Sequence, residues 1–321
     1  MHLLSLLPLL MLLKFIEYKN SYTFSMWSFF SRHYEIPRKV LSNGFSMPVY
    51  GLGTWHIGGS WEPGPKEKDS PDTLAIRKMV DQGINHIDTA EVYGNTNTEK
   101  VVGHALKGGR REKVFLVSKV FEPFDYDGVV SACHASLHRL KTTYLDLYLI
   151  HRYNPDYPLK EIIRALDRLK DEGLVQNIGV CNFNVEHLKE AQHYSKHTIV
   201  CNQVHYNLEF REPERAGLLE YCQQNDIMLA AYRALQRGSL STEAPSIIKE
   251  MAKKYRKTHA QVALNWLIAQ PNVVALAKTR TFSHLYENLG ALGWELEGGD
   301  VERLRRDYPD QKDISNAVPL G

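Results

Sequence analysis

Apolar residues along most of this chain recur in two alternating patterns. Short apolar runs predict eight strands, over residues 49–54, 85–89, 113–120, 144–151, 175–180, 199–204, 227–232 and 272–278. Stretches with apolar residues three or four positions apart predict helices over 70–83, 97–107, 125–140, 159–173, 184–194, 212–225, 245–269 and 281–292. Strict alternation of strand and helix predicts a parallel sheet covered by helices. Eight such units predict an α/β fold of the (β/α)8 TIM-barrel type, with an active site at the carboxyl ends of its strands.

Two local signals refine this fold. Residues 39–52 carry Asn43-Gly44 between apolar runs, which predicts a β-hairpin before the first barrel strand. We expect this hairpin to plug the end of the barrel opposite the active site. Ser70, Pro71 and Gly83 occupy the N-cap, the first helical position and the end of the first predicted helix.

The N-terminal residues do not fit the pattern. Residues 3–13 are almost entirely apolar, yet a membrane span needs about 20 residues. No Lys or Arg precedes the run, and no clear small-residue cleavage site follows it. A disordered extension with the true start near Met26, a weak membrane anchor and an export signal are the alternatives, and we favour the first. We predict an extension over 1–33, disordered or weakly membrane-associated, and a barrel over 34–321.

Composition narrows the class of protein. The 321 residues are 43% apolar and carry a net charge of +2, so we expect no nucleic acid partner and no membrane partner. The four cysteines, Cys133, Cys181, Cys201 and Cys222, form no CxxC pair and match neither a zinc site nor a disulfide scaffold. We expect buried thiols, a reducing cytoplasmic location and no bound metal. The sequence leaves the oligomeric state open and is compatible with a monomer.

Ionisable residues follow three successive predicted strands. Asp88, Lys119 and His151 end the second, third and fourth strands, and Tyr93 lies five residues after Asp88. Neighbouring parallel strands are about 4.8 Å apart, so the four side chains can meet at one point. An ammonium group beside a phenol lowers the phenol pKa, a carboxylate keeps the ammonium group charged, and a histidine can orient a carbonyl group. The arrangement therefore predicts proton transfer to a carbonyl oxygen.

From about Glu35 onward the chain closely resembles the aldo-keto reductase family. The motifs that carry the resemblance are GLGTW, DTAEVYGN, SKV, the IH of the fourth strand, GVCNF, NQVHYN and LYENLGAL. The resemblance implies a (β/α)8 barrel and NADPH-dependent reduction of aldehyde or ketone carbonyls to alcohols. It also implies that Tyr93 is the general acid, that Lys119 and Asp88 activate it, and that His151 orients the substrate.

The same resemblance implies contacts with the nicotinamide end of the cofactor. Asn182 and Gln203 would hold the carboxamide, because an amide side chain can both donate and accept. Tyr232 would stack on the nicotinamide ring, and Arg233, which replaces the serine more usual in the family, could reach the pyrophosphate. Cys181 also stands where the family usually has serine, and a thiol is a weaker hydrogen-bonding group.

At the adenosine end, the resemblance places Lys278, Thr279 and Arg280 around the 2′-phosphate, at the start of a helix. Two cations suit a phosphate dianion, so we expect NADPH rather than NADH. His284 stands where many members have arginine. Glu287 and Asn288 would bind the adenine. The implied cofactor contacts are Gly53, Thr54, Trp55, Asp88, Cys181, Asn182, Gln203, Tyr232, Arg233, Leu235, Lys278, Thr279, Arg280, His284, Glu287 and Asn288.

The substrate pocket is the least determined part. Trp55 and Trp61 are expected walls, alongside Tyr93 and His151. Arg152 could favour an acidic carbonyl substrate or pair with a carboxylate in a loop, and both remain open. The short tail after Asp313 is expected to leave the mouth open, which suits sugars, small aldehydes or ketones. A nucleotide-binding sensor or channel-associated subunit with little turnover is the alternative function. A sugar isomerase would need metal ligands at other strand ends.

Overall fold

The structure, a computed structural model, describes residues 33–59 and 70–321. Residues from Ile36 to Gly321 form one compact unit. The predicted extension over 1–33 lies almost entirely outside the described residues. Among the described residues, no helix has the length and apolar character needed to cross a membrane.

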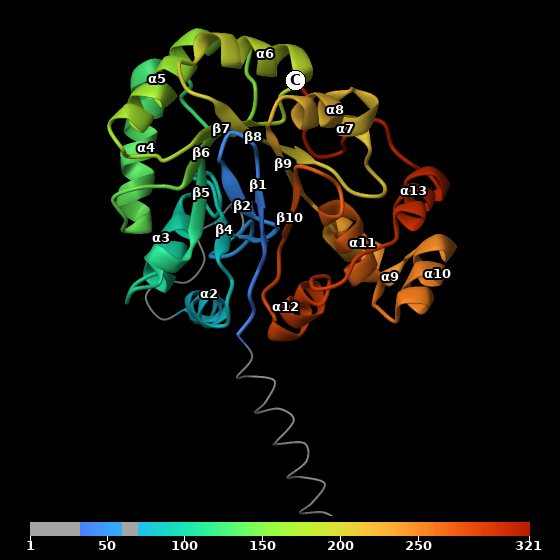
Figure 1. The fold of residues 1–321 in the computed structure, drawn as a ribbon. Helices are drawn as coiled ribbons and strands as arrows, with labels where there is room; N and C mark the ends of the chain where they lie inside the picture. The colour runs from blue at the N-terminus through green and yellow to red at the C-terminus, as the bar shows by residue number, and fades with distance from the viewer. Residues whose placement is uncertain (1–32, 60–69) are drawn as a thin grey trace, which may run out of the picture. The chain divides into compact units, whose positions relative to one another are not determined.

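Eight parallel strands close into a barrel, as predicted (Figure 1). Each of them coincides with a predicted apolar run, and the order around the barrel is β10-β3-β4-β5-β6-β7-β8-β9. Their bounds are β3 Tyr50–Gly53, β4 His86–Asp88, β5 Phe115–Val120, β6 Leu147–Ile150, β7 Ile178–Cys181, β8 Ile199–His205, β9 Met228–Tyr232 and β10 Val273–Ala277. The (β/α)8 barrel is therefore confirmed, and the ends of β4, β5 and β6 lie side by side.

Helices surround the barrel (Figure 1). They are α2 Pro71–Asp81, α3 Asn97–Ala105, α4 Tyr126–Leu140, α5 Leu159–Asp171, α6 Val185–Tyr194, α7 Glu212–Arg215, α8 Leu218–Gln224, α9 Ser239–Thr242, α10 Ser246–Tyr255, α11 His259–Ile268, α12 Phe282–Leu289 and α13 Gly298–Asp307, with 3₁₀ turns η1 Arg111–Lys113 and η2 Gln236–Gly238. Ser70 caps α2 by accepting the backbone N–H of Thr73, as the sequence predicts.

Two predicted helices are wrong in their extent. The stretch 212–225 is divided at Gly217, whose φ of 69° is left-handed and ends one helix before the next begins. The stretch 245–269 is divided at Arg256, which takes a left-handed φ of 54°, and Thr258 and Gln261 then form a capping box that starts α11. The C-terminal helix α13 was not predicted, because it begins with two glycines and buries little besides Leu304.

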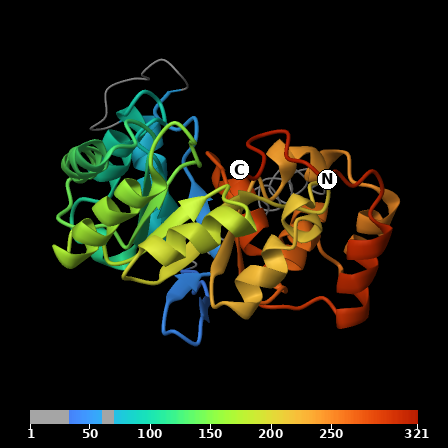
Figure 2. The same cartoon turned by 90° about the horizontal axis from the view of Figure 1, so that it is seen from above.

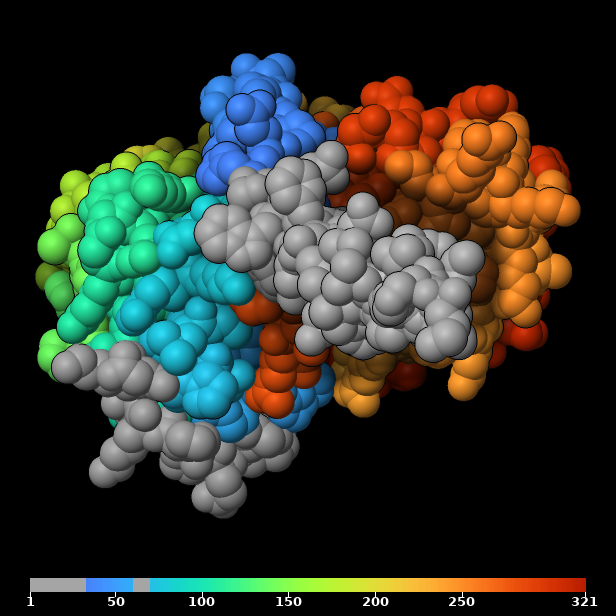
Figure 3. Space-filling model, turned by 90° about the horizontal axis from the view of Figure 1, so that it is seen from below, coloured from blue at the N-terminus to red at the C-terminus, as the bar shows by residue number. Residues whose placement is uncertain are grey.

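The predicted hairpin is present and fills one end of the barrel. Strands β1 Arg38–Val40 and β2 Ser46–Pro48 pair antiparallel across the turn that contains Gly44. Phe45 and Met47 are buried with strand residues that point into the barrel, and the Phe45 ring lies 6.1 Å from that of Phe115, the first residue of β5. In the space-filling view the blue residues, which include the hairpin, project at the upper edge next to the cyan residues (Figure 3).

The C-terminal tail lies at the other end of the barrel (Figure 2). Both carboxylate oxygens of Glu212 accept tail N–H groups, from Ser315 at 2.9 Å and from Leu320 at 3.2 Å. The Gly321 N–H donates to the carbonyl of Asn182, just past the end of β7, at 2.9 Å. These hydrogen bonds hold the tail against α7 and the residue after β7, and the expectation that a short tail leaves the mouth open stays a prediction.

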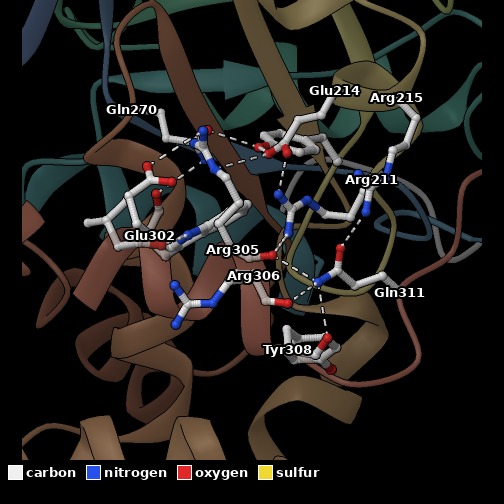
Figure 4. A network of polar contacts seen from close by, with 12 residues as sticks. Arg211, Glu214, Arg215, Gln270, Glu302, Arg305, Arg306, Tyr308 and Gln311 are labelled. Carbon is white, nitrogen blue, oxygen red and sulfur yellow. Dashed lines mark hydrogen bonds and ion pairs between the residues drawn. The ribbon is translucent and has the colours of Figure 1, made fainter. Parts of the chain in front are cut away.

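A buried polar cluster, here called the Arg211 network, ties α13 to the barrel (Figure 4). The Arg211 side chain is 1% exposed; it donates to Glu214 and, at 3.1 Å, to the carbonyl of Arg305. Arg305 donates to Gln270 at 2.7 Å, and Arg211 stacks over the Trp266 ring at 4.8 Å. Since these residues come from α7, α11, α13 and the segments beside them, the network joins the late elements of the chain.

Candidate active site

Four ionisable side chains meet at the carboxyl ends of β4, β5 and β6. The Lys119 ammonium group donates to Asp88 Oδ1 at 2.7 Å, to the Thr89 carbonyl at 2.7 Å and to the Tyr93 hydroxyl at 3.4 Å. These three acceptors use all the donors of the lysine. The Tyr93 and His151 rings meet edge to face, with centroids 5.7 Å apart. The structure therefore brings together all four residues that the sequence singled out.

Burial and charge oppose each other at this cluster. Lys119 is fully buried, and burial alone would lower its pKa, but the Asp88 carboxylate and Tyr93 outweigh burial and raise it. Burial is the largest influence on Tyr93 and raises its pKa to about 12, although the charge of Lys119 acts in the lowering direction. The expected net lowering of the phenol pKa is thus wrong, because desolvation of the phenolate exceeds the attraction of the ammonium group.

His151 is held as a neutral imidazole. Burial foremost, and then the positive charges of Lys119 and Arg152, lower its pKa well below the usual value. The Phe121 ring packs edge to face against it, with centroids 5.6 Å apart. Within the described part of the chain, its buried Nδ1 atom has no hydrogen-bond partner. A neutral imidazole can donate one N–H to a carbonyl oxygen.

Two amide side chains and a tyrosine line the next side of the mouth. Gln203 donates to Asp88 Oδ2 at 2.7 Å. Asn182 donates to the carbonyl of His151 at 3.2 Å and accepts from the Tyr232 hydroxyl at 2.9 Å. Its φ of 60° is left-handed, a conformation that asparagine tolerates better than most residues. Each amide keeps hydrogen-bonding capacity beyond these contacts.

Cys181, the last residue of β7, is buried in the interior of the barrel. It is 1% exposed and packs in the apolar core, where burial raises the pKa of its thiol. On the outer side, the Tyr232 ring stacks nearly parallel to His205, with centroids 5.6 Å apart. The His205 side chain is hydrogen-bonded to the Ser315 hydroxyl of the tail at 2.8 Å. The tail is therefore connected through His205 to the Tyr232 ring, which the resemblance expects to stack on the nicotinamide.

A group of cations lies around the loop after β3. Burial and the positive charges of Lys278, Arg280 and Arg237 together lower the pKa of His56. The Arg237 guanidinium group lies 5.4 Å above the Trp55 ring. Arg280 contacts the His56 carbonyl and lies 3.7 Å from Asp72. Arg237 was missed by the sequence analysis, although it is only two residues beyond Leu235.

The other predicted cofactor residues lie on both sides of these cations. Thr54 is fully buried and donates to the Asp88 carbonyl at 2.9 Å. Thr279 is 4% exposed, and its hydroxyl donates to the Thr281 carbonyl beside the start of α12. Asn288 is buried and donates to the Tyr50 hydroxyl at 3.2 Å. Gly53 and Leu235 are partly buried, as is Glu287, whereas His284 is exposed.

The predicted substrate residues differ in their surroundings. Arg152 pairs with Glu122 at 2.9 Å and lies 4.8 Å over the Phe121 ring, so the loop-carboxylate alternative describes it in this structure. Arg233, which was predicted as a cofactor contact, donates to Asn316 in the tail at 3.0 Å. Trp55 is 36% exposed at the mouth. Trp61 lies outside the described residues.

The fold and the cluster define a (β/α)8 barrel with an ionisable site at the carboxyl ends of its strands, the usual place for an active site in this fold. The model of the aldo/keto reductase family matches residues 50–307. The chain belongs to the aldo/keto reductase family of oxidoreductases.

Individual proteins agree with this assignment. The chain is 37% identical over 277 residues to methylglyoxal reductase YeaE of Escherichia coli (strain K12), covering 84% of this chain and 94% of the relative. The thermostable aldo-keto reductase Tm1743, solved with the inhibitor epalrestat, matches with a TM-score of 0.81 and 42% identity over 84% of this chain and 99% of that one. An aldo/keto reductase from Klebsiella pneumoniae, solved with NADP and acetate, matches with a TM-score of 0.73 and 32% identity, over 88% of this chain and 98% of that one.

Proposed function

We propose that this chain is an NADPH-dependent reductase that converts aldehyde or ketone carbonyls to alcohols. One observation carries the proposal: a fully buried ammonium group, Lys119, is shared between the carboxylate of Asp88 and the hydroxyl of Tyr93, beside His151 at the mouth of the barrel. Such an arrangement can donate a proton and stabilise the charge that remains.

Tyr93 is the general acid in this proposal. With a pKa raised to about 12, the phenol is protonated throughout the neutral range and therefore carries the proton that a reduction needs. As the proton leaves, the phenolate forms 3.4 Å from the Lys119 ammonium group, which stabilises it. Asp88 keeps that ammonium group charged and fixed in direction.

His151 orients the carbonyl group. Because its pKa is low, the imidazole is neutral at physiological pH and can donate an N–H to the carbonyl oxygen. The Tyr93 and His151 rings lie edge to face with centroids 5.7 Å apart, so both side chains are close enough to donate to one substrate oxygen. Two donors on one oxygen polarise the carbonyl and place it for protonation.

The residues present fit a phosphorylated dinucleotide. Lys278, Arg280 and Arg237 gather positive charge near His56, and Lys278 and Arg280 precede the N-terminus of α12. Asn182 and Gln203 would hold the nicotinamide carboxamide with their remaining donors and acceptors, and Tyr232 would pack on the ring. A bound NADPH supplies the hydride. We propose NADPH over NADH because the cations suit a 2′-phosphate, as expected also from the relative solved with NADP.

We propose small aldehydes and dicarbonyl compounds as substrates. The E. coli relative is named a methylglyoxal reductase, and the tail of this chain is hydrogen-bonded at Gly321 to the carbonyl of Asn182. Since Arg152 is paired with Glu122, its charge is partly neutralised and gives no strong preference for acidic substrates. Trp55 supplies an apolar wall.

The direct test mixes the protein with NADPH and methylglyoxal and follows the absorbance of the reduced cofactor. We expect turnover with NADPH, and a higher KM with NADH. Absence of turnover with methylglyoxal and with a panel of simple aldehydes, despite NADPH binding measured by fluorescence, would refute the proposal and favour the nucleotide-binding sensor.

A further inference from the structure

Glu91 lies in the loop between Asp88 and Tyr93, and its side chain is only 14% exposed. We infer that Glu91 is a positioning residue that holds the Tyr93 loop in register with the segment that follows Lys119. The inference rests on the proposed function, since it concerns the spacing of the proposed acid and its lysine.

Glu91 joins the two segments from both its main chain and its side chain. Its carboxylate oxygen Oε1 accepts the backbone N–H of Phe121 at 2.5 Å and that of Glu122 at 3.4 Å. In the opposite direction, the Glu91 N–H donates to the Lys119 carbonyl at 3.3 Å. Because these contacts run both ways, the loop after β4 cannot move away from the end of β5 without leaving N–H groups unpaired.

The contacts of Glu91 lie close in sequence to residues of the proposed site. Tyr93 follows Glu91 by two positions, and Lys119 precedes Phe121 by two positions. The distance that matters, from Lys119 Nζ to the Tyr93 hydroxyl, is 3.4 Å. Phe121 also packs its ring on His151. The carboxylate thus sets the relative placement of three of the four site residues without touching the reacting atoms.

A second ion pair behind Glu91 keeps its carboxylate in place. Arg139, from α4, lies 3.8 Å from Glu91 and 2.5 Å from Glu99. Glu99 is fully buried and accepts from the Ser118 hydroxyl at 2.5 Å. Ser118 directly precedes Lys119, so this buried chain of contacts returns to the same strand. Arg139 keeps its stronger partner, Glu99, if the Glu91 carboxylate is removed.

The test compares two variants that differ in acceptor capacity but little in volume. Glu91→Gln keeps an oxygen that can accept the Phe121 N–H, and Glu91→Met has none. We expect Glu91→Gln to keep kcat within about threefold, and Glu91→Met to lose about 10- to 100-fold in kcat with KM for the carbonyl compound and NADPH affinity nearly unchanged. Glu161→Met, at an exposed ion pair on α5, is the matched control and should leave both constants unchanged.

Crystal structures of the wild type and Glu91→Met provide a readout that does not depend on turnover. We expect the Lys119 Nζ to Tyr93 hydroxyl distance to lengthen in Glu91→Met and to stay the same in Glu91→Gln. An unchanged distance would overturn the inference, as would full kcat of Glu91→Met well below its melting temperature. If wild type lacks turnover, the proposed function fails, and the structural comparison still decides whether Glu91 sets this spacing.

Discussion

Two buried ionic clusters in this barrel contain similar charged groups but differ in the groups that their cations contact. In the Arg211 network, the guanidinium group donates to Glu214 and to the Arg305 carbonyl and stacks on Trp266. In the site cluster, the Lys119 ammonium group has two contacts of 2.7 Å, with Asp88 and the Thr89 carbonyl, and its longest contact, 3.4 Å, is with the Tyr93 hydroxyl. The Arg211 cation contacts a carboxylate, a backbone carbonyl and an aromatic ring, whereas the Lys119 cation also contacts a phenol hydroxyl, which can itself give up a proton.

Under the proposed function, this difference separates an ion pair that stabilises the fold from one that takes part in proton transfer. Burying a charge is costly unless the protein supplies partners, and both clusters supply them. The Arg211 network uses its partners to join the C-terminal helix to the barrel (Figure 4). The Lys119 cluster brings the Tyr93 phenol next to the neutral imidazole of His151, and in the proposed function these two groups bind the substrate carbonyl.

Tyr93→Phe removes the phenol hydroxyl that contacts Lys119, and should show the largest effect on turnover. We expect kcat to fall by about 10²- to 10⁴-fold, because the proton donor is lost. NADPH affinity and the melting temperature should be nearly unchanged, since the ring still fills the same space. Steady-state kinetics, fluorescence titration and thermal unfolding measure the three quantities. A kcat within threefold of wild type would contradict the role of Tyr93.

Arg211→Met should have the opposite effect, lowering stability while leaving turnover unchanged. The substitution removes the main cation of Glu214 and leaves it with Arg305 at 3.8 Å, so we expect the free energy of unfolding to fall by about 3 kcal/mol, the lower end of the range for breaking a buried ion pair. The kcat of the folded variant should be unchanged at temperatures below its melting point. Urea unfolding measures the loss. Arg303→Met, at the exposed pair with Glu250, is the control and should change stability by less than about 1 kcal/mol. Equal losses in both variants would remove the distinction.

Arg152→Ala should give the smallest effect, because its ion pair with Glu122 lies at the mouth but is exposed to solvent. We expect stability to change by less than about 1 kcal/mol. The ratio of kcat/KM for a keto acid to that for a neutral aldehyde should fall by only about threefold, since Glu122 already partly neutralises the guanidinium group. A selective loss of a hundredfold or more for the keto acid would show that Arg152 binds acidic substrates directly.

The sequence predicted those parts of the molecule that depend on local periodicity. All eight barrel strands follow from apolar runs, and the positions of Asp88, Lys119 and His151 at strand ends follow from the strand order. The division of the stretch 245–269 did not follow, because Arg256 takes a left-handed conformation that arginine rarely adopts. Whether a helix continues past such a residue depends on what the two halves pack against.

Other parts of the site depend on contacts between distant residues. The net effect on the Tyr93 phenol depends on how deeply it is buried, and proximity to Lys119 alone gave the wrong sign for its pKa. The course of the tail depends on Glu212, about a hundred positions earlier in the chain, which accepts two tail N–H groups. Neither the depth of a side chain nor a long-range partner can be read from spacing along one sequence.

The hairpin at the far end of the barrel has a kinetic consequence. Because Phe45 and Met47 pack with the side chains that fill the barrel interior, molecules have to approach Tyr93 from the carboxyl ends of the strands. In the proposed function NADPH and the carbonyl compound therefore enter from the same side. The molecule that binds deeper then has to bind first and leave last.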